Sequence, residues 1–182
     1  MAFKLIIGLG NPGTEYENTY HNIGGRFIDY LGSGILFKRQ KSFQFSRKGD
    51  LILAKPLIFM NESGEAARDA LRRFKLRPSQ MLIVHDDNDI PLGELRLAFG
   101  RGSAGHKGAE SVIKELGNKE FWRARIGIKK NAIKKAGDIV LKKITKSDWE
   151  KLIRVFRSLE IQIFNEEGDA ERNSVRQSAD AR

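Results

Sequence analysis

FKLIIGL, residues 3–9, is a nearly uninterrupted apolar run, and a polar loop follows it. An apolar run of this length bounded by turn residues predicts a buried strand. The run MLIV at residues 81–84 has the same character. Strands that are buried on both faces are typical of sheets covered by helices on both sides. The two runs therefore indicate the centre of an α/β fold.

Helical and extended patterns alternate around these two runs. Further strands are predicted at residues 43–46, 51–54, 94–99 and 121–128, the first two forming a hairpin. Helices are predicted at residues 21–31, 61–74, 108–116 and 147–164, the last with Ser147 as its N-cap. We expect a single-domain α/β sandwich over residues 1–165, with a mixed twisted sheet and helices on both faces. A polar, flexible tail is expected at residues 166–182.

The composition limits the classes of protein that need to be considered. The chain has 182 residues and no Cys, which excludes disulfides, thiolate zinc sites and a Cys nucleophile. The first residues lack the layout of a signal peptide, and no apolar run reaches the roughly 20 residues that span a bilayer. We therefore expect a cytoplasmic protein with no membrane contact.

The net charge of +10 is unevenly distributed along the chain. Residues 119–157, called here the basic segment, contain thirteen Lys and Arg against four Asp and Glu. Such a concentration of positive charge is typical of a surface that binds phosphate groups. A pair of solvated, charge-rich helices is the alternative interpretation.

Polar side chains stand where predicted strands end or predicted helices begin. Asn11 follows the first strand, His21 and Asn61 open two helices, and Asp86 follows the MLIV strand. Because strand ends in an open α/β sheet meet at one crevice, these four side chains could form a hydrolytic site. A His can take a proton from water at neutral pH, a carboxylate can orient it, and Asn amides can hold a carbonyl oxygen. The alternative is that Asn61 is a helix cap and Asp86 a loop residue.

Two other motifs suggest ligands but fit them poorly. GLGNPG at residues 8–13 matches the dinucleotide-binding pattern G-x-G-x-x-G. A polar loop follows it instead of a helix, and the candidate ribose-binding Asp29 lies within a helical pattern, so a nicotinamide cofactor is disfavoured. The acidic run at residues 86–89 does not fit a calcium loop, and a turn before Pro91 explains it more simply than a magnesium site with one or two carboxylates. The three His have no paired ligand spacing, so we expect no metal and no cofactor.

Taken together, these segments resemble the bacterial peptidyl-tRNA hydrolase family. The motifs that carry the resemblance are GLGNPG (8–13), Tyr16, TYHNIG (19–24), Lys55-Pro56, FMNESG (59–64), HDDNDIPLG (85–93), GHKG (105–108) and RIGI (125–128). The resemblance implies hydrolysis of the ester that joins a peptide to the 3′ ribose of tRNA. It also implies that His21 is the general base, that Asp86 orients it, and that Asn11 and Asn61 position the peptide carbonyl and the water.

The resemblance assigns the remaining candidate residues to substrate binding. Tyr16 and Met60 would line the crevice, and Lys107 and Arg125 would contact the peptide and the tRNA. Acceptor-stem phosphates would be met by a group of basic side chains: Lys129, Lys130, Lys134, Lys135, Lys142 and Lys143. Such contacts position RNA without reading its sequence. Residues 136–145 would form a lid, and nothing in the sequence demands more than a monomer.

The chain departs from the family pattern at four positions. Tyr20 and Ala98 stand where a basic residue is usual, Lys107 where an Asn is common, and Ala104 where a Gly is common. These departures put individual tRNA and peptide contacts in question, and none affects His21 or Asp86. A non-catalytic RNA-binding module on the same fold is the alternative function.

Overall fold

The computed structural model describes residues 3–130 and 137–179. Its strands are β1 (Leu5–Gly8), β2 (Lys38–Arg39), β3 (Phe43–Lys48), β4 (Leu51–Pro56), β5 (Met81–Pro91), β6 (Leu95–Phe99) and β7 (Trp122–Lys129). Its α-helices are α1 (Ile23–Leu31), α2 (Ser63–Phe74), α3 (Lys107–Leu116), α4 (Gly137–Val140) and α5 (Lys146–Ala179). Three 3₁₀ turns complete the described elements: η1 (Tyr20–Asn22), η2 (Met60–Glu62) and η3 (Pro78–Gln80).

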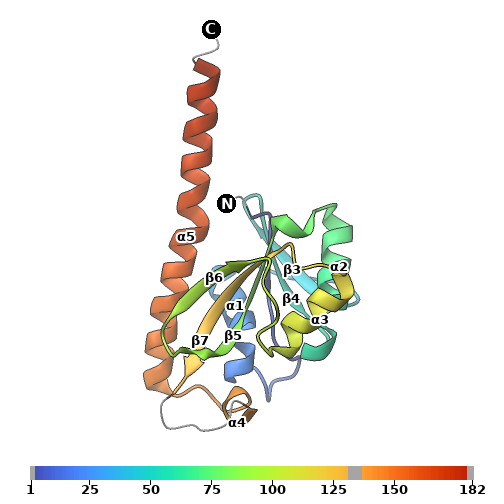
Figure 1. Cartoon of the computed structure of the whole chain (residues 1–182), viewed down its shortest axis with the longest axis vertical. Coiled ribbons are helices and arrows are strands. Elements are labelled where there is room, and N and C mark those ends of the chain that lie inside the picture. The colour runs from blue at the N-terminus through green and yellow to red at the C-terminus, as the bar shows by residue number, and fades with distance from the viewer. Residues whose placement is uncertain (1–2, 131–136, 180–182) are drawn as a thin grey trace.

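The seven strands form one mixed sheet in the order β2-β3-β4-β1-β5-β7-β6 (Figure 1). The central strands β4, β1, β5 and β7 run parallel to one another, while β2 and β3 on one side and β6 on the other run antiparallel to their neighbours. The predicted mixed α/β sheet and the predicted hairpin of β3 and β4 are confirmed.

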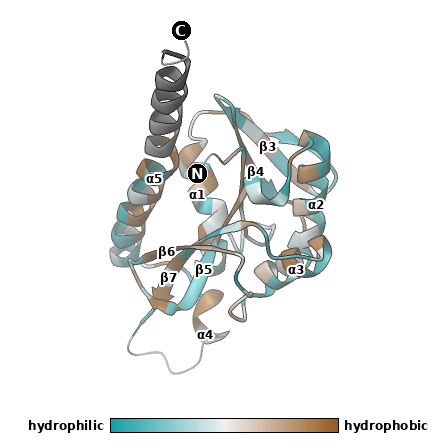
Figure 2. Cartoon of the chain, turned by 45° about the horizontal axis from the view of Figure 1, so that its top comes forward, coloured by the Kyte–Doolittle hydropathy of each residue, from teal (hydrophilic) through white to brown (hydrophobic). Residues whose placement is uncertain are grey.

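Helices cover both faces of the sheet, as the sequence pattern predicts. On one face α1 and α5 pack on the sheet through side chains such as Phe27 and Phe156. On the other face α2 and α3 contribute Leu71 and Val112 to a second core. Figure 2 shows the resulting pattern, in which hydrophobic and hydrophilic residues alternate along α2 and the first half of α5. One buried face on each helix is the expected consequence of this periodicity.

Two glycines allow α1 to lie directly against the backbone of the sheet. A Cβ atom on Gly8 would lie 2.1 Å from the carbonyl oxygen of Gly24, and one on Gly24 would lie 2.1 Å from that of Val84. Only residues without a side chain permit so close an approach. This contact fixes the start of α1, and with it the turn η1, over the ends of β1 and β5.

Strand β5 is longer than predicted. It continues beyond Val84 to Pro91, so the interpretation of residues 86–89 as a turn is wrong. Asp86 pairs with Ile126 of β7, and the register shifts between Asp87 and Pro91. Pairing with β7 thus overrides the weak strand propensity of an acidic run. Strand β2 has only two residues and is too short to produce a sequence pattern.

Helix α5 differs from the prediction at both ends. Its N-terminal cap is Thr145, whose hydroxyl accepts a hydrogen bond from the Asp148 N–H, so the assignment of Ser147 as N-cap is wrong. The helix continues past Phe164 to Ala179. The residues beyond Phe164 include one Gly and no Pro, so local propensity permits a helix there without an apolar stripe. Flexibility of the tail stays a prediction. Within the described part of the chain, no helix is both long and apolar enough to cross a membrane.

Candidate active site

A cavity of about 670 Å³ opens at the carboxyl-terminal ends of β1 and β5. Its walls come from η1, η2, the loop before α3, and α4 with the residue that follows it. The lining residues are Asn11, His21, Phe59, Met60, Asn61, Asp86, Asp87, Asn88, Asp89, Ala104, Gly105, His106, Lys107, Val140 and Leu141. The four polar residues that the sequence places at strand ends and helix starts therefore do meet in one cavity, as predicted.

His21 and Asp86 are directly hydrogen-bonded. The His21 Nδ1 atom lies 2.9 Å from Asp86 Oδ1, and the two side chains are 13% and 3% exposed. An ionised carboxylate can only accept, so the proton of the neutral His21 ring lies on Nδ1. The lone pair of its other nitrogen, Nε2, is then available as a base.

His106 is a second donor to the same carboxylate oxygen. Its Nε2 atom lies 3.0 Å from Asp86 Oδ1. Its Nδ1 atom accepts a hydrogen bond of 3.1 Å from the Ala109 N–H, which makes His106 the N-cap of α3. Because Nδ1 must keep a lone pair for this cap, His106 is the neutral ring with its proton on Nε2. Sequence reasoning assigned no role to His106, although GHKG at residues 105–108 is one of the motifs that carry the family resemblance.

The surroundings of Asp86 keep its carboxyl group ionised. Burial by itself would raise the pKa of this group. The hydrogen bonds that the ring N–H groups of His106 and His21 donate to the carboxylate outweigh burial and hold the pKa well below its usual range. Asp86 is thus a permanent acceptor between two imidazole N–H groups.

His85 is buried next to this cluster. It is not among the described residues that line the cavity. Its Nδ1–H donates to the carbonyl oxygen of Asp86 at 2.6 Å, and its Nε2 has no hydrogen-bond partner. Burial lowers its pKa well below the usual value. His85 is therefore a neutral core side chain.

The two Asn residues are held in different ways. The Asn11 Oδ1 accepts a hydrogen bond of 2.8 Å from the Met60 N–H, which leaves the amide NH₂ group of Asn11 to act as a donor. The side chain of Asn22 fixes the Asn11 backbone, accepting from its N–H at 2.9 Å and donating to its carbonyl oxygen at 2.8 Å. Asn61 follows in η2 and is exposed to the cavity.

The predicted substrate-binding residues are only partly gathered at the cavity. Met60 and Lys107 line it, whereas Tyr16 is absent from the lining contributed by the described residues. Arg125 lies on β7 and donates from Nε to Asp87 Oδ2 at 2.7 Å. Phe59 and Leu141, both exposed, add apolar walls. Neither residue was singled out from the sequence, although Leu141 lies within the segment predicted as a lid.

The basic side chains fall into three groups. Lys129, Lys142 and Lys143 are exposed. Lys130 is not free, because its ammonium group contacts the Asp148 carboxylate and the Tyr20 hydroxyl. Lys134 and Lys135 lie outside the described residues.

His21, Asp86 and His106 also bring three possible metal ligands within 4.8 Å of one another. A metal on Nε2 of His106 would displace the proton that this atom donates to Asp86. Moving that proton to Nδ1 would break the helix cap. The donor set therefore fits a hydrogen-bonded carboxylate better than a metal site.

Comparisons with known proteins agree with this geometry. Residues 5–178 match the family model described as peptidyl-tRNA hydrolase. The peptidyl-tRNA hydrolase of Aquifex aeolicus is 44% identical over 147 residues, which cover 77% of this chain and 76% of that protein. One from Coxiella burnetii is 46% identical over 129 residues, covering 69% of each chain. The crystal structure of the peptidyl-tRNA hydrolase of Acinetobacter baumannii superposes with a TM-score of 0.77 at 26% identity, covering 93% of this chain and 92% of that one.

Proposed function

The chain belongs to the peptidyl-tRNA hydrolase family and hydrolyses peptidyl-tRNA; on this premise, we propose that His21, oriented by Asp86, is its general base. The observation that carries the proposal is the 2.9 Å hydrogen bond between His21 Nδ1 and Asp86 Oδ1. This bond fixes the ring proton on Nδ1 and leaves Nε2 to act on water.

The reaction can be written with these groups alone. His21 Nε2 takes a proton from a water molecule while the water oxygen attacks the carbonyl carbon of the ester. The tetrahedral intermediate then expels the 3′ oxygen of the ribose, which receives the proton from His21. The products are a peptide with a free carboxyl group and a tRNA with a free 3′ hydroxyl group.

The two Asn residues supply donors for the developing charge. The Asn11 side chain has its oxygen occupied by the Met60 N–H, so its NH₂ group is the part that remains for substrate. We assign Asn11 and Asn61 to the carbonyl oxygen and to the attacking water. Donors fixed before the reaction stabilise the intermediate without reorganisation.

Substrate binding is assigned to the cavity walls and to the basic surface. We propose that Met60 and Lys107 contact the peptide, and that Arg125, Lys129, Lys142 and Lys143 contact acceptor-stem phosphates. The assignments of Tyr16, Lys134 and Lys135 stay predictions. We also propose that the protein acts as a monomer, because one chain supplies the whole site, and in the cytoplasm, where ribosomes make its substrate.

The decisive experiment compares wild type with His21→Ala on purified peptidyl-tRNA, without added metal. We expect His21→Ala to release no peptide above background while it binds tRNA as wild type does. Normal turnover by this variant would refute the assignment of the base. The non-catalytic RNA-binding alternative is not favoured, and it would predict no release by either protein.

A further inference from the structure

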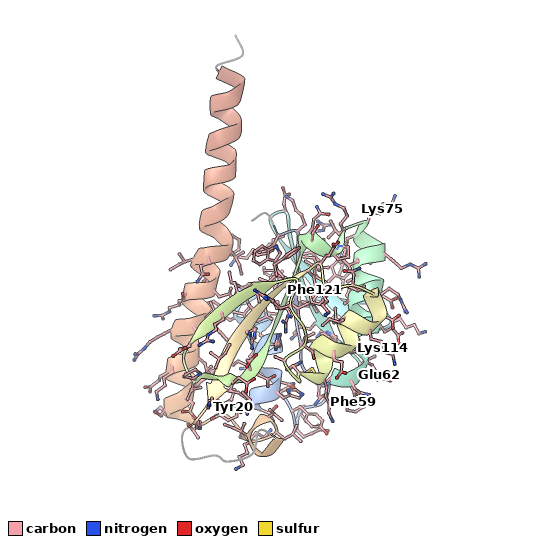
Figure 3. All side chains as sticks on the ribbon, viewed as in Figure 1. Tyr20, Phe59, Glu62, Lys75, Lys114 and Phe121 are labelled. Carbon is pink, nitrogen blue, oxygen red and sulfur yellow. The ribbon has the colours of Figure 1, made fainter. Side chains whose placement is uncertain are left out.

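A second buried polar cluster adjoins η1, the turn that carries His21, and takes no part in the reaction above. It consists of Tyr20 from η1, Lys130 after β7, and Asp148 in the first turn of α5; we call it the Tyr20 network. Tyr20 donates its hydroxyl proton to Asp148 Oδ2, and Lys130 Nζ donates to Tyr20 Oη at 2.7 Å and to Asp148. The Thr145 hydroxyl also donates to Asp148, at 2.7 Å. Figure 3 shows Tyr20 at the lower end of the sheet, near the start of α5.

The network is internally satisfied. Tyr20 is 1% exposed and Asp148 is 6% exposed, so their polar atoms depend on one another. Burial and the hydrogen bond to Asp148 raise the pKa of Tyr20, which therefore remains a donor. Burial would lower the pKa of Lys130, but Asp148 and Tyr20 outweigh it and raise that pKa, so the ammonium charge is retained. One positive and one negative charge thus balance within the network.

Backbone contacts connect the network to the residue that carries the base. The Tyr20 N–H donates to the Lys142 carbonyl oxygen at 3.2 Å, and the Ile144 N–H donates to the Asn18 carbonyl oxygen at 2.8 Å. Thr19 and Lys143 form an antiparallel bridge between these two bonds. The residues that precede His21 are therefore paired with the segment that precedes α5. The hydrogen bond from the Tyr20 side chain to Asp148 links η1 to the first turn of α5 as well.

The Tyr20 ring has a separate role from its hydroxyl group. It packs with Ile128 and with Ile139 of α4. The end of α4 supplies Val140 to the cavity wall. Removing the hydroxyl alone should therefore leave this wall in place while it releases the turn from Asp148 and Lys130.

We infer that Tyr20, Lys130 and Asp148 position His21 for the reaction, and that Lys130 acts through Asp148 and Tyr20 and not as a contact to RNA phosphates. The inference rests on the function proposed above. It distinguishes Lys130 from its neighbour Lys129, which is exposed at the end of β7. Two adjacent lysines of the basic segment then have different roles.

The test uses these neighbours as a matched pair. Lys130→Met, Lys129→Met and Tyr20→Phe are assayed for kcat and KM with peptidyl-tRNA and for the salt dependence of tRNA binding. We expect Tyr20→Phe and Lys130→Met each to lower kcat about tenfold, because small displacements of a catalytic group are costly. Their KM should stay within about threefold, and their salt slopes should match wild type. Lys129→Met should reduce the salt slope by about one.

A double variant and a control for folding complete the design. Tyr20→Phe combined with Lys130→Met should lower kcat no more than either alone, because both break one network. Thermal unfolding of each variant confirms that it is folded at the assay temperature; Tyr20→Phe, which loses one oxygen atom, is the mildest of them.

Three results would overturn the inference. A salt slope reduced in Lys130→Met as much as in Lys129→Met would make Lys130 an RNA contact. Tyr20→Phe and Lys130→Met could keep wild-type kcat and lose only thermal stability, which would make the network purely structural. In both cases an inactive His21→Ala shows that the proposed function survives. An active His21→Ala would show that His21 is not the base, and a network that positions His21 would then have no role in the reaction.

Discussion

Asp86→Asn changes the charge of the site while it keeps the shape of the side chain. In the wild type, Asp86 Oδ1 accepts hydrogen bonds from His21 and His106 at 2.9 and 3.0 Å. An Asn oxygen can still accept these bonds, but it carries no negative charge. The variant therefore isolates the electrostatic part of the role of Asp86, which is to stabilise the imidazolium that forms as His21 takes a proton.

The size of the effect follows from the distance and the burial. Two unit charges about 4 Å apart interact by about 4 kcal/mol at an effective dielectric constant of about 20, a value that suits a partly buried pair. If the proton is between half and fully transferred in the transition state, the loss is about 2 to 4 kcal/mol. Since 1.36 kcal/mol corresponds to a tenfold change in rate, kcat should fall roughly 30- to 1,000-fold.

The assay is single-turnover release of peptide from peptidyl-tRNA, which reports the chemical step. Asp69→Asn is the matched control, because Asp69 is also a paired carboxylate, accepting from Ser42 at 2.6 Å, but lies on α2 away from the cavity. We expect Asp69→Asn to keep the wild-type single-turnover rate constant. A single-turnover rate constant for Asp86→Asn within threefold of wild type would refute the reasoning, because Asp86 would then only hold the ring in place.

Three further predictions test the surroundings of the site. His106→Phe should lower kcat, measured by peptide release, because Asp86 loses one of its donors. It should also lower the free energy of unfolding in urea by about 1 kcal/mol, because α3 loses its cap; if neither quantity changes, the assigned tautomer is wrong. Because His85 has a lowered pKa in the folded state, its contribution to the free energy of unfolding should be complete above pH ~6.5. Below that pH, the free energy of unfolding should fall by up to about 1.4 kcal/mol per pH unit, because the unfolded chain binds a proton that the folded chain does not. His85→Gln should flatten this loss in pH-dependent urea unfolding, and an unchanged slope would assign it to other groups. Lys129→Met with Lys142→Met should reduce the salt slope of tRNA binding by about two, and an unaltered slope would place the RNA surface elsewhere.

Periodicity predicted the fold where local pattern and tertiary structure agree. The run at residues 3–9 and the amphipathic pattern of α2 each contain enough information for the strand and the helix that form there. The acidic run after Val84 does not, because its extended conformation comes from pairing with β7, a partner about forty residues away. The N-cap of α5 was missed for a similar reason: two hydroxyl residues lie near the start, and the contact with Asp148 selects Thr145 over Ser147.

The candidate site shows the same division. Residue types at strand ends and helix starts were enough to predict that four polar side chains meet in one cavity: Asn11, His21, Asn61 and Asp86. The topology of a parallel sheet brings those positions together. The involvement of Lys130 with Asp148 could not be predicted, since nothing local separates it from Lys129. Whether a lysine faces solvent or a buried carboxylate depends on where the next helix begins.

The choice of His21 and not His106 as the base also depends on tertiary structure. Both rings donate to the same oxygen of Asp86, so the carboxylate alone does not distinguish them. His106 has its second nitrogen committed to the Ala109 N–H, and it could take up a proton there only by breaking the cap of α3. A helix N-terminus also disfavours a positive charge. His21 makes no side-chain cap, so its second nitrogen is not committed to a backbone N–H in the same way. The cap of α3 thus converts one of two similar imidazoles into a fixed donor and leaves the other to exchange protons with water.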